Sequence, residues 1–282
     1  MNPIVTEGTS DPGALYLDLL KECLTRHMFG EPFQAVGSPR GIFRRALYVP
    51  LRRLLAFRQI ELVRRAAFDP DERAEGRDWP LAAETMIGLR RLDNLQYCVT
   101  DVLRRRVPGD LIETGVWRGG ATIFMRAVLK VYGDTERIVW VADSFQGLPK
   151  PDPARYPIDA ADRLWTHTRL AVSLEEVKAN FARYALLDGQ VRFLVGWFRD
   201  TLPSAPINKL AVLRLDGDMY ESTMDALRSL YPKLSVGGYV IIDDYGAVPA
   251  CKAAVKDFRA GHGIGEKLER IDWTGVFWQR LS

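Results

Sequence analysis

Cysteine, histidine and long apolar stretches are all scarce in this sequence of 282 residues. The three cysteines (Cys23, Cys98 and Cys251) lie far apart and form no CxxC spacing, which indicates neither a zinc site nor a disulfide framework. No apolar run approaches the roughly 18 residues of a membrane span, and the N-terminus lacks a basic stretch followed by an apolar one. We therefore expect a cytoplasmic protein with no transmembrane segment.

The sequence also lacks a strong net charge. A charge of +3 is too small to indicate nucleic-acid binding, and 47% apolar residues are enough for a large core. The charge is uneven, because eight arginines face one acid between Ser38 and Arg65, which leaves 31 basic and 35 acidic residues elsewhere. A basic amphipathic helix in this segment could lie on a membrane surface. We favour a cover helix or an oligomer contact with solvated arginines.

The dinucleotide fingerprint GxGxxG is absent, which disfavours an NAD-dependent dehydrogenase. What is present after Pro108-Gly109 is an alternation of apolar strands and amphipathic helices, typical of a parallel sheet with right-handed crossovers. The expected strands are 110–115, 138–143, 191–195, 209–216 and 237–243. The expected helices are 119–132, 173–186, 221–231 and 249–260. The fold class is therefore α/β.

The two ends of the sequence have a different pattern. Apolar residues recur at helical spacing in 14–27 and from Glu84 to about Arg106, which predicts two helices. Between them, Asp69-Pro70-Asp71-Glu72 is expected to form a loop. At the other end, 267–280 reads as a strand, a tight turn at Thr274-Gly275 and a second strand, which adds an antiparallel hairpin to the parallel sheet.

Two acidic pairs follow two neighbouring apolar runs. Asp216 and Asp218 end the run Leu213-Arg214-Leu215, and Asp243 and Asp244 end the run 239–242. Ligands bind outside the carboxyl ends of the strands in an open α/β sheet, so four carboxylates are expected at one rim. Like charges are costly together unless a cation lies between them, and Mg²⁺ prefers oxygen ligands. For Asp218, a helix N-cap is the alternative to a catalytic role.

Other acids and glycines follow the first two strands of the predicted sheet. Glu113-Thr114-Gly115 begins a turn in which a carboxylate suits an ammonium or hydroxyl group, although a structural glycine loop is as compatible. Asp143-Ser144 suits the two hydroxyls of a ribose, or caps a turn. Trp197 flanks an adenine or packs in the core. An amino acid at one end and a ribose with adenine at the other describe S-adenosylmethionine, whose positive sulfonium suits an acidic rim.

Several stretches together resemble the macrocin O-methyltransferase family, whose members methylate sugar hydroxyls of natural products. They are Thr85-Met86-Ile87-Gly88, Glu113-Thr114-Gly115-Val116-Trp117-Arg118-Gly119-Gly120, Val141-Ala142-Asp143-Ser144-Phe145-Gln146-Gly147-Leu148-Pro149, Gly196-Trp197-Phe198, Asp216-Gly217-Asp218-Met219-Tyr220 and Ile241-Ile242-Asp243-Asp244-Tyr245. The resemblance covers residues 14–28 and 70–280. The arginine-rich stretch 30–66 departs from the pattern as an expected insertion.

The resemblance implies a class I, Rossmann-like methyltransferase with a mostly parallel seven-stranded sheet, a C-terminal antiparallel hairpin and an N-terminal helical lid. It implies a lid and oligomerisation segment at 1–83, a catalytic domain at 84–282 and a homo-oligomer. Magnesium ligands are expected at Asp216, Asp243 and Asp244, and a general base at Asp218. Contacts to S-adenosylmethionine are expected at Thr85, Met86, Glu113, Gly115, Trp117, Gly119, Gly120, Asp143, Ser144, Phe145, Trp197 and Asp216.

The expected reaction is methyl transfer from S-adenosylmethionine to a sugar hydroxyl of a small-molecule glycoside, such as a macrolide-type antibiotic. We hypothesise that Mg²⁺ fixes two vicinal hydroxyls and lowers the pKa of one, and that Asp218 takes the proton. The acceptor pocket is expected to draw on the loop 150–172, where His167 is either a substrate contact or a surface residue. The main alternative is a catechol-type O-methyltransferase, and a non-catalytic binding module is a third class.

Overall fold

The computed structural model describes residues 11–30, 33–36, 41–65 and 67–282. A seven-stranded sheet forms the centre, with the order β5-β4-β3-β6-β7-β9-β8. Its strands are β3 (Asp110–Thr114), β4 (Val139–Asp143), β5 (Val191–Val195), β6 (Leu210–Leu215), β7 (Leu234–Ile242), β8 (Glu269–Arg270) and β9 (Val276–Gln279). The strands β3 to β7 are parallel, and β9 pairs antiparallel with β7 and with β8.

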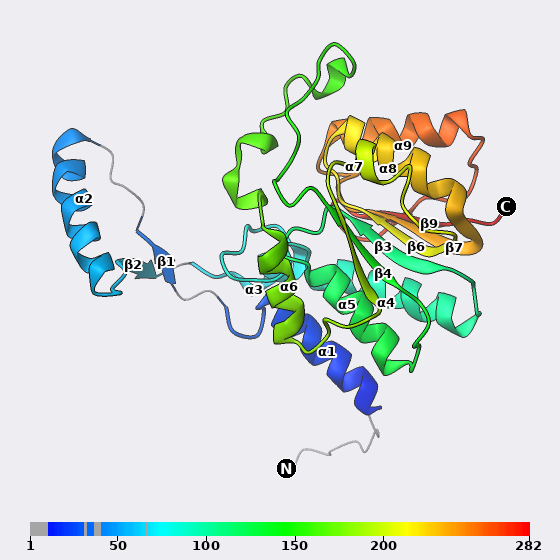
Figure 1. The fold of residues 1–282 in the computed structure, drawn as a ribbon, viewed down its shortest axis with the longest axis horizontal. Helices are drawn as coiled ribbons and strands as arrows, with labels where there is room; N and C mark the ends of the chain where they lie inside the picture. Colours follow the sequence, from blue (N-terminus) through cyan, green and yellow to red (C-terminus); the bar gives the residue numbers. More distant parts are fainter. Residues whose placement is uncertain (1–10, 31–32, 37–40, 66) are drawn as a thin grey trace, which may run out of the picture.

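Helices cover both faces of this sheet, so the molecule has three layers (Figure 1). The helices are α1 (Pro12–Thr25), α2 (Ile42–Phe57), α3 (Pro70–Glu75), α4 (Leu89–Arg104), α5 (Gly120–Val131), α6 (Leu174–Arg183), α7 (Phe198–Thr201), α8 (Tyr220–Leu230) and α9 (Pro249–Gly261). Short 3-10 turns occupy Pro157–Asp159, Leu164–Thr166, Thr168–Leu170 and Tyr231–Lys233.

Alternating side chains along the strands build two cores. Leu111 and Val212 face the layer of α1, α4, α5 and α6, while Ile112 and Leu213 face the layer of α7, α8 and α9. All four are fully buried. Successive side chains of a strand point to opposite faces, so one apolar run can serve both cores. The short, uniformly apolar strands of the sequence are explained by this double burial.

The N-terminal region is divided between the body and a projecting arm. Helix α1 packs on α4 and α5, as its buried leucines require. The arm consists of β1 (Phe33–Ala35), α2 and β2 (Val63–Arg65), with β1 and β2 paired antiparallel. Figure 1 shows α2 standing apart from the sheet and its covering helices. The roles of residues 1–83 as a lid and an oligomerisation segment stay predictions, and residues 1–10 and 37–40 lie outside the described part.

Three expected element boundaries are wrong. The helix from Glu84 begins only at Leu89, because the amide of Glu84 donates to the carbonyl of Leu24 and its carbonyl accepts from Gly120. The expected loop at Asp69-Pro70-Asp71-Glu72 is the start of α3, since Asp69 accepts from the amides of Asp71 and Glu72 as an N-cap and Pro70 occupies the first turn.

The third wrong boundary is in the terminal hairpin, whose first strand is β8 alone. The chain leaves the strand early because Asp272 accepts from the amides of Thr274 and Gly275, which gives a side-chain-stabilised turn. The expected hairpin itself is confirmed. No helix in the described residues is long and apolar enough to cross a membrane.

Candidate active site

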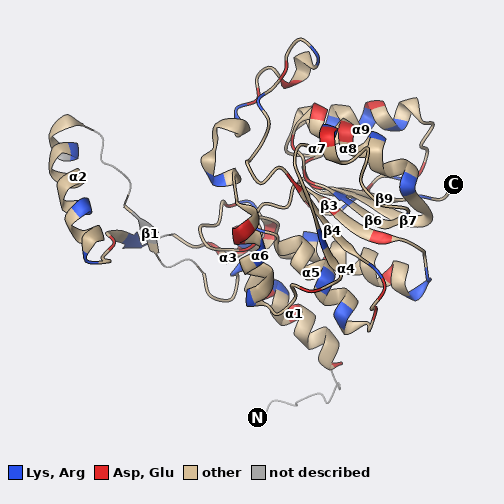
Figure 2. Ribbon diagram, in the orientation of Figure 1, with Lys and Arg blue, Asp and Glu red and all other residues tan. Residues whose placement is uncertain are grey.

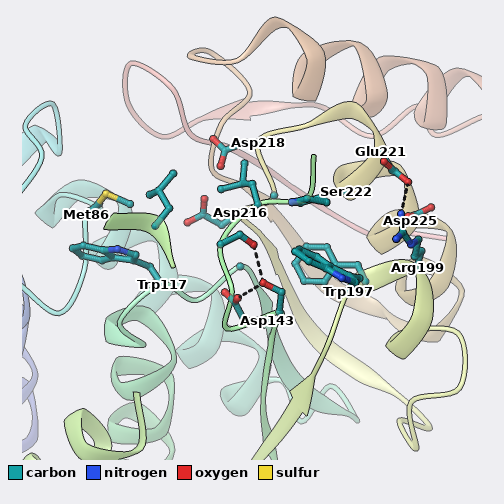
Figure 3. A pocket seen from close by; sticks show the side chains of 18 residues that line it. Met86, Trp117, Asp143, Trp197, Arg199, Asp216, Asp218, Glu221, Ser222 and Asp225 are labelled. Atoms are coloured by element: carbon teal, nitrogen blue, oxygen red, sulfur yellow. Dashed lines mark hydrogen bonds and ion pairs between the residues drawn. The ribbon is translucent and has the colours of Figure 1, made fainter. Parts of the chain in front are cut away.

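A cavity opens at the carboxyl ends of the parallel strands. Its empty volume is about 760 Å³, part of which is open to solvent. Figure 3 shows Met86 and Trp117 at one end and Trp197 with Arg199 toward the other, with Asp143 between them. Aromatic and apolar walls with a few convergent polar groups are typical of a small-molecule site.

The turn after β3 forms one wall of the cavity. Gly115 has φ +82°, and a Cβ there would lie 1.7 Å from the carbonyl oxygen of Asp216, so only glycine fits between the two strand ends. Gly119 also has positive φ, and a Cβ on Gly120 would lie 2.6 Å from the carbonyl oxygen of Glu84. The turn is therefore packed tightly against the end of β6 and the segment before α4.

Asp143 is the polar group at the middle of the cavity. Its carboxylate accepts from the amides of Val116 at 2.8 Å and Phe145 at 2.7 Å, so it both organises the turns and lines the cavity. Burial raises the pKa of Asp143, and these backbone donors oppose the shift. Ser144 accepts from the amide of Gln146 and also lines the cavity. Turn formation by Asp143 and Ser144 is confirmed, and contact with a ligand stays a prediction that their place on the cavity wall permits.

The expected cofactor residues divide into two groups. Those on the cavity wall are Met86, Gly115, Trp117, Asp143, Ser144, Trp197 and Asp216. The cavity wall as described does not include Thr85, Glu113, Gly119, Gly120 or Phe145. Trp197, for which core packing was the alternative, is half-buried on the wall.

Glu113 is turned away from the cavity toward a buried arginine. Arg214, 1% exposed, binds the carboxylates of Glu113 and Asp243 and lies 3.0 Å from Asp216 Oδ2. The sheet register explains this contact, because Glu113 and Arg214 are directly opposite each other on β3 and β6. Burial raises the pKa of Glu113 to about 8, with Arg214 opposing the shift.

The acidic pairs converge as the sequence predicts. Asp216, Asp243 and Asp244 each offer an oxygen within 4.8 Å of the others. These hard oxygen donors fit Mg²⁺. Among the described residues, only two cations, Arg91 and Arg214, contact the three aspartates, so one negative charge of the cluster has no cation beside it. Burial first, and the neighbouring carboxylates second, raise the pKa of Asp216 to about 6 and that of Asp244 well above its ordinary value.

Asp218 lines the cavity together with Asp216 of the carboxylate cluster. Its backbone is left-handed, with φ +53°, and its amide donates to Asp244 Oδ2 at 3.1 Å. Met219, and not Asp218, is the N-cap of α8. Burial and the charges of Asp216 and Asp243 raise the pKa of Asp218 to about 8.

The sequence interpretation missed two buried arginines that bind the carboxylates of the candidate site. Arg214 carried a signal, since a charged residue inside an apolar strand run needs a buried partner. Arg91, on α4, binds Asp243 and lies 3.0 Å from Asp272 Oδ2, but nothing in its local sequence distinguishes it from Arg90. Each binds a different oxygen of Asp243, and each oxygen keeps a second lone pair for a cation.

The loop between β4 and α6 forms the roof of the cavity. Leu148, Pro149 and Leu170 line it, and the carbonyl of Arg169 accepts from the indole of Trp117 at 2.9 Å. His167 is exposed, with its ring 5.5 Å from that of Trp79.

The strand order, the antiparallel β9 and Asp143 at the end of β4 define a class I methyltransferase. The family model of the macrocin O-methyltransferases (TylF) matches residues 13–280, a range that includes the stretch 30–66. The chain belongs to this family and is an S-adenosylmethionine-dependent O-methyltransferase.

Similar proteins of known activity span nearly the whole chain. A tetracenomycin-C 4'-O-methyltransferase of Streptomyces olivaceus, named for a rhamnosyl substrate, is 53% identical over 97% of this chain and 95% of its own. The mycinamicin III 3''-O-methyltransferase of Micromonospora griseorubida is 48% identical over 95% of this chain and 97% of its own. The solved structure of the O-methyltransferase NovP has a TM-score of 0.83 at 48% identity, covering 96% of this chain and all of that one.

Proposed function

We propose that this protein methylates a sugar hydroxyl of a glycosylated natural product, such as a macrolide-type antibiotic, in a magnesium-dependent reaction. The observation that carries the proposal is the cluster of Asp216, Asp243 and Asp244 beside a cavity suited to S-adenosylmethionine. The names of the relatives, which include a rhamnosyl acceptor, support a sugar as the acceptor.

The proposed reaction is an in-line displacement. The acceptor oxygen forms a bond to the methyl carbon, the carbon–sulfur bond breaks, and its electron pair stays on sulfur to give S-adenosylhomocysteine. A divalent cation held by the three aspartates would supply positive charge that orients the acceptor and makes its hydroxyl more acidic. That cation would also lower the pKa of Asp218 and keep its carboxylate ionised, so that Asp218 accepts the hydroxyl proton. Its side chain reaches both the cavity and the rim of the cluster, as this role requires.

The residues around the cavity give each end of the donor a matching environment. Asp143 accepts from the ribose hydroxyls, and Trp197 packs beside the adenine. We assign the methionine end of the donor to the part of the cavity where Met86 and Trp117 lie (Figure 3). The acidic rim favours a sulfonium over a negatively charged dinucleotide.

A methyl-transfer assay tests the proposal. The protein is dialysed against EDTA and assayed, with and without added Mg²⁺, against a panel of deoxysugar glycosides and a simple catechol. We expect glycoside methylation that needs Mg²⁺, and a loss of turnover of at least about 100-fold in Asp218→Asn with cofactor affinity retained. Activity that resists EDTA contradicts the metal role, near-normal turnover of the variant contradicts the base, and preference for the catechol contradicts the acceptor class.

We also propose that the arm is a contact between copies of this chain. Large apolar side chains of α2 are exposed, by 85% for Ile42, 92% for Phe43, 80% for Leu47 and 86% for Phe57. Apolar patches of this kind on a soluble protein are usually covered by a partner. The arm is basic, with arginines along α2 (Figure 2), and the rest of the chain is acidic in balance, which suits a second copy.

The mass of the protein in solution tests this assembly. Light scattering after size exclusion should show an oligomer, and Phe43→Asp with Leu47→Asp should give a monomer. The matched control is Leu281→Asp, an exposed apolar residue (65%) outside the arm. A monomeric wild-type protein overturns the proposal, as does an oligomer unaffected by the arm substitutions. If the wild-type protein is a monomer, its sedimentation with anionic vesicles is measured next. Sedimentation by the wild-type protein but not by the arm variant would assign the arm to membranes.

A further inference from the structure

The first turn of α8 takes its cap from a distant part of the chain. Met219 occupies the N-cap position, and its thioether does not satisfy the free amides of the first turn. The amide of Tyr220 instead donates to Asp159 Oδ1 at 2.8 Å, and that of Glu221 to Asp159 Oδ2 at 3.0 Å. Both oxygens of one carboxylate, 61 and 62 positions away in sequence, therefore hold the start of this helix.

Asp159 is firmly placed in the loop 150–172. It ends the 3-10 turn Pro157–Asp159 and is 1% exposed. The ring of Tyr156 packs against that of Tyr220 with centroids 5.6 Å apart, so the loop and the helix also contact each other beside the two hydrogen bonds to Asp159. A carboxylate at a helix N-terminus is also stabilised by the positive end of the helix dipole. Two hydrogen bonds and one aromatic contact therefore hold the loop against α8, and we call this contact the clamp.

Asp218 lies directly before this clamped turn. Its own amide is held by Asp244 on one side, and the amides of Tyr220 and Glu221 are held by Asp159 on the other. A non-glycine residue with φ +53° persists only where its surroundings fix it. The backbone from Asp218 to Glu221 is thus held by carboxylates from two other parts of the chain, Asp244 and Asp159.

We propose that Asp159 is a positioning residue for methyl transfer, which clamps the first turn of α8 to the loop 150–172 and so fixes the place of Asp218. This inference rests on the proposed function, in which Asp218 accepts the proton. Proton transfer needs the base within hydrogen-bond reach of the hydroxyl, and a displacement of about 1 Å can reduce the rate about 100-fold. Asp159 touches neither donor nor acceptor in this role.

The test uses Asp159→Ala, Asp159→Asn and Ser173→Ala in the full-length protein. Ser173 caps α6 by accepting from the amide of Glu176, so its variant removes a helix cap that is remote from Asp218. For Asp159→Ala we expect kcat to fall about 100-fold, with the Kd for S-adenosylhomocysteine within about twofold of wild type. Asp159→Asn keeps one carbonyl acceptor and should fall in between, while Ser173→Ala should keep kcat.

Hydrogen exchange gives a readout that does not depend on turnover. In Asp159→Ala, the amides of Tyr220 and Glu221 should exchange at least about tenfold faster, while those of β6 stay protected. Normal kcat in Asp159→Ala overturns the proposal. So does an equal loss of kcat and cofactor affinity with exchange raised throughout the protein, because that pattern means a merely structural role. If the Ala variant does not fold, the Asn variant decides by the same criteria.

A double variant separates this inference from the proposed function. Asp159→Ala should have little further effect on kcat in an Asp218→Asn background, because both changes remove the same proton acceptor from use. Full additivity of the two losses overturns the positioning role. An Asp218→Asn protein that turns over normally overturns the base itself, whatever Asp159 does, so the two failures give different results.

Discussion

The guanidinium of Arg91 binds the carboxylate of Asp243 across 152 positions of sequence. Arg91 comes from α4, and Asp243 ends β7, so this pair joins a covering helix to the acidic cluster. The same guanidinium lies 3.0 Å from Asp272 Oδ2 in the turn before β9. One cation therefore fixes a proposed metal ligand and the terminal hairpin together.

Replacing Arg91 by alanine should destabilise the protein strongly. Asp243 and Asp272 are both buried; without Arg91, Asp243 keeps only Arg214 and Asp272 loses its cation, and breaking a buried pair in this way costs about 3–5 kcal/mol. Urea unfolding of the metal-free protein measures this change. Arg90→Ala is the matched control, since Arg90 is 63% exposed and 3.6 Å from Glu75, and its loss should stay within about 0.5 kcal/mol. Equal effects at both positions would refute the role of Arg91.

Substitution of Gly115 by alanine should abolish cofactor binding. The new Cβ would overlap the carbonyl oxygen of Asp216, so the end of β3 or of β6 must move. Gly133→Ala is the control, because Gly133 also has positive φ (+67°) but no atom lies within 4 Å of its added Cβ. That variant should lose only about 1–2 kcal/mol of stability, because alanine is strained in the left-handed conformation. Calorimetry with S-adenosylhomocysteine and thermal unfolding compare the two; normal binding by Gly115→Ala would contradict the clash.

The stability of the metal-free protein should fall as pH rises from about 4 to 8. The pKa of Asp216 is raised to about 6 and that of Asp218 to about 8, both from 3.8, so the folded protein binds more protons than the unfolded chain in this range. A cation competes with these protons. Saturating Mg²⁺ should therefore raise the melting temperature more at about pH 8 than at about pH 6. A Mg²⁺ effect that shrinks with rising pH would argue against binding at this cluster.

Asp143→Ala should weaken cofactor binding by about 10- to 100-fold, the range expected for a lost hydrogen bond to a charged group. The variant also removes the acceptor for the amides of Val116 and Phe145. Calorimetry with S-adenosylhomocysteine gives the affinity. Glu136→Ala, at an exposed position before β4, provides the control and should bind as wild type does. Unchanged affinity in Asp143→Ala would remove Asp143 from the cofactor site.

The sequence predicts the sheet well because its signals are local. The expected strand 191–195 coincides with β5, and the other strand boundaries differ by three residues at most for the parallel strands. Apolar runs bounded by glycine or polar residues carry this information by themselves. The start of α4 could not be placed in this way, because Glu84 is held out of the helix by Leu24 and Gly120, which are remote in sequence.

The candidate site was predictable where strand ends determine it. Asp216, Asp243 and Asp244 come together because parallel strands deliver their carboxyl ends to one edge. The surroundings of these carboxylates were not predictable, because only the folded chain brings them near. Arg91, which binds Asp243, comes from a helix, and Asp159, which holds the first turn of α8, comes from a loop. Arg214 lies between these cases: its register opposite Glu113 follows once β3 and β6 are paired.

The contact of Gly115 with Asp216 also bears on how this enzyme could be redesigned. No side chain fits between the turn after β3 and Asp216 of the acidic cluster. A substitution at this contact therefore alters the proposed cofactor site and the proposed metal site together. New acceptor preference is better sought by exchanging parts of the loop 150–172, which approaches the cavity from outside. A grafted loop must keep a carboxylate in the place of Asp159, or the transplant will change the catalyst along with its substrate.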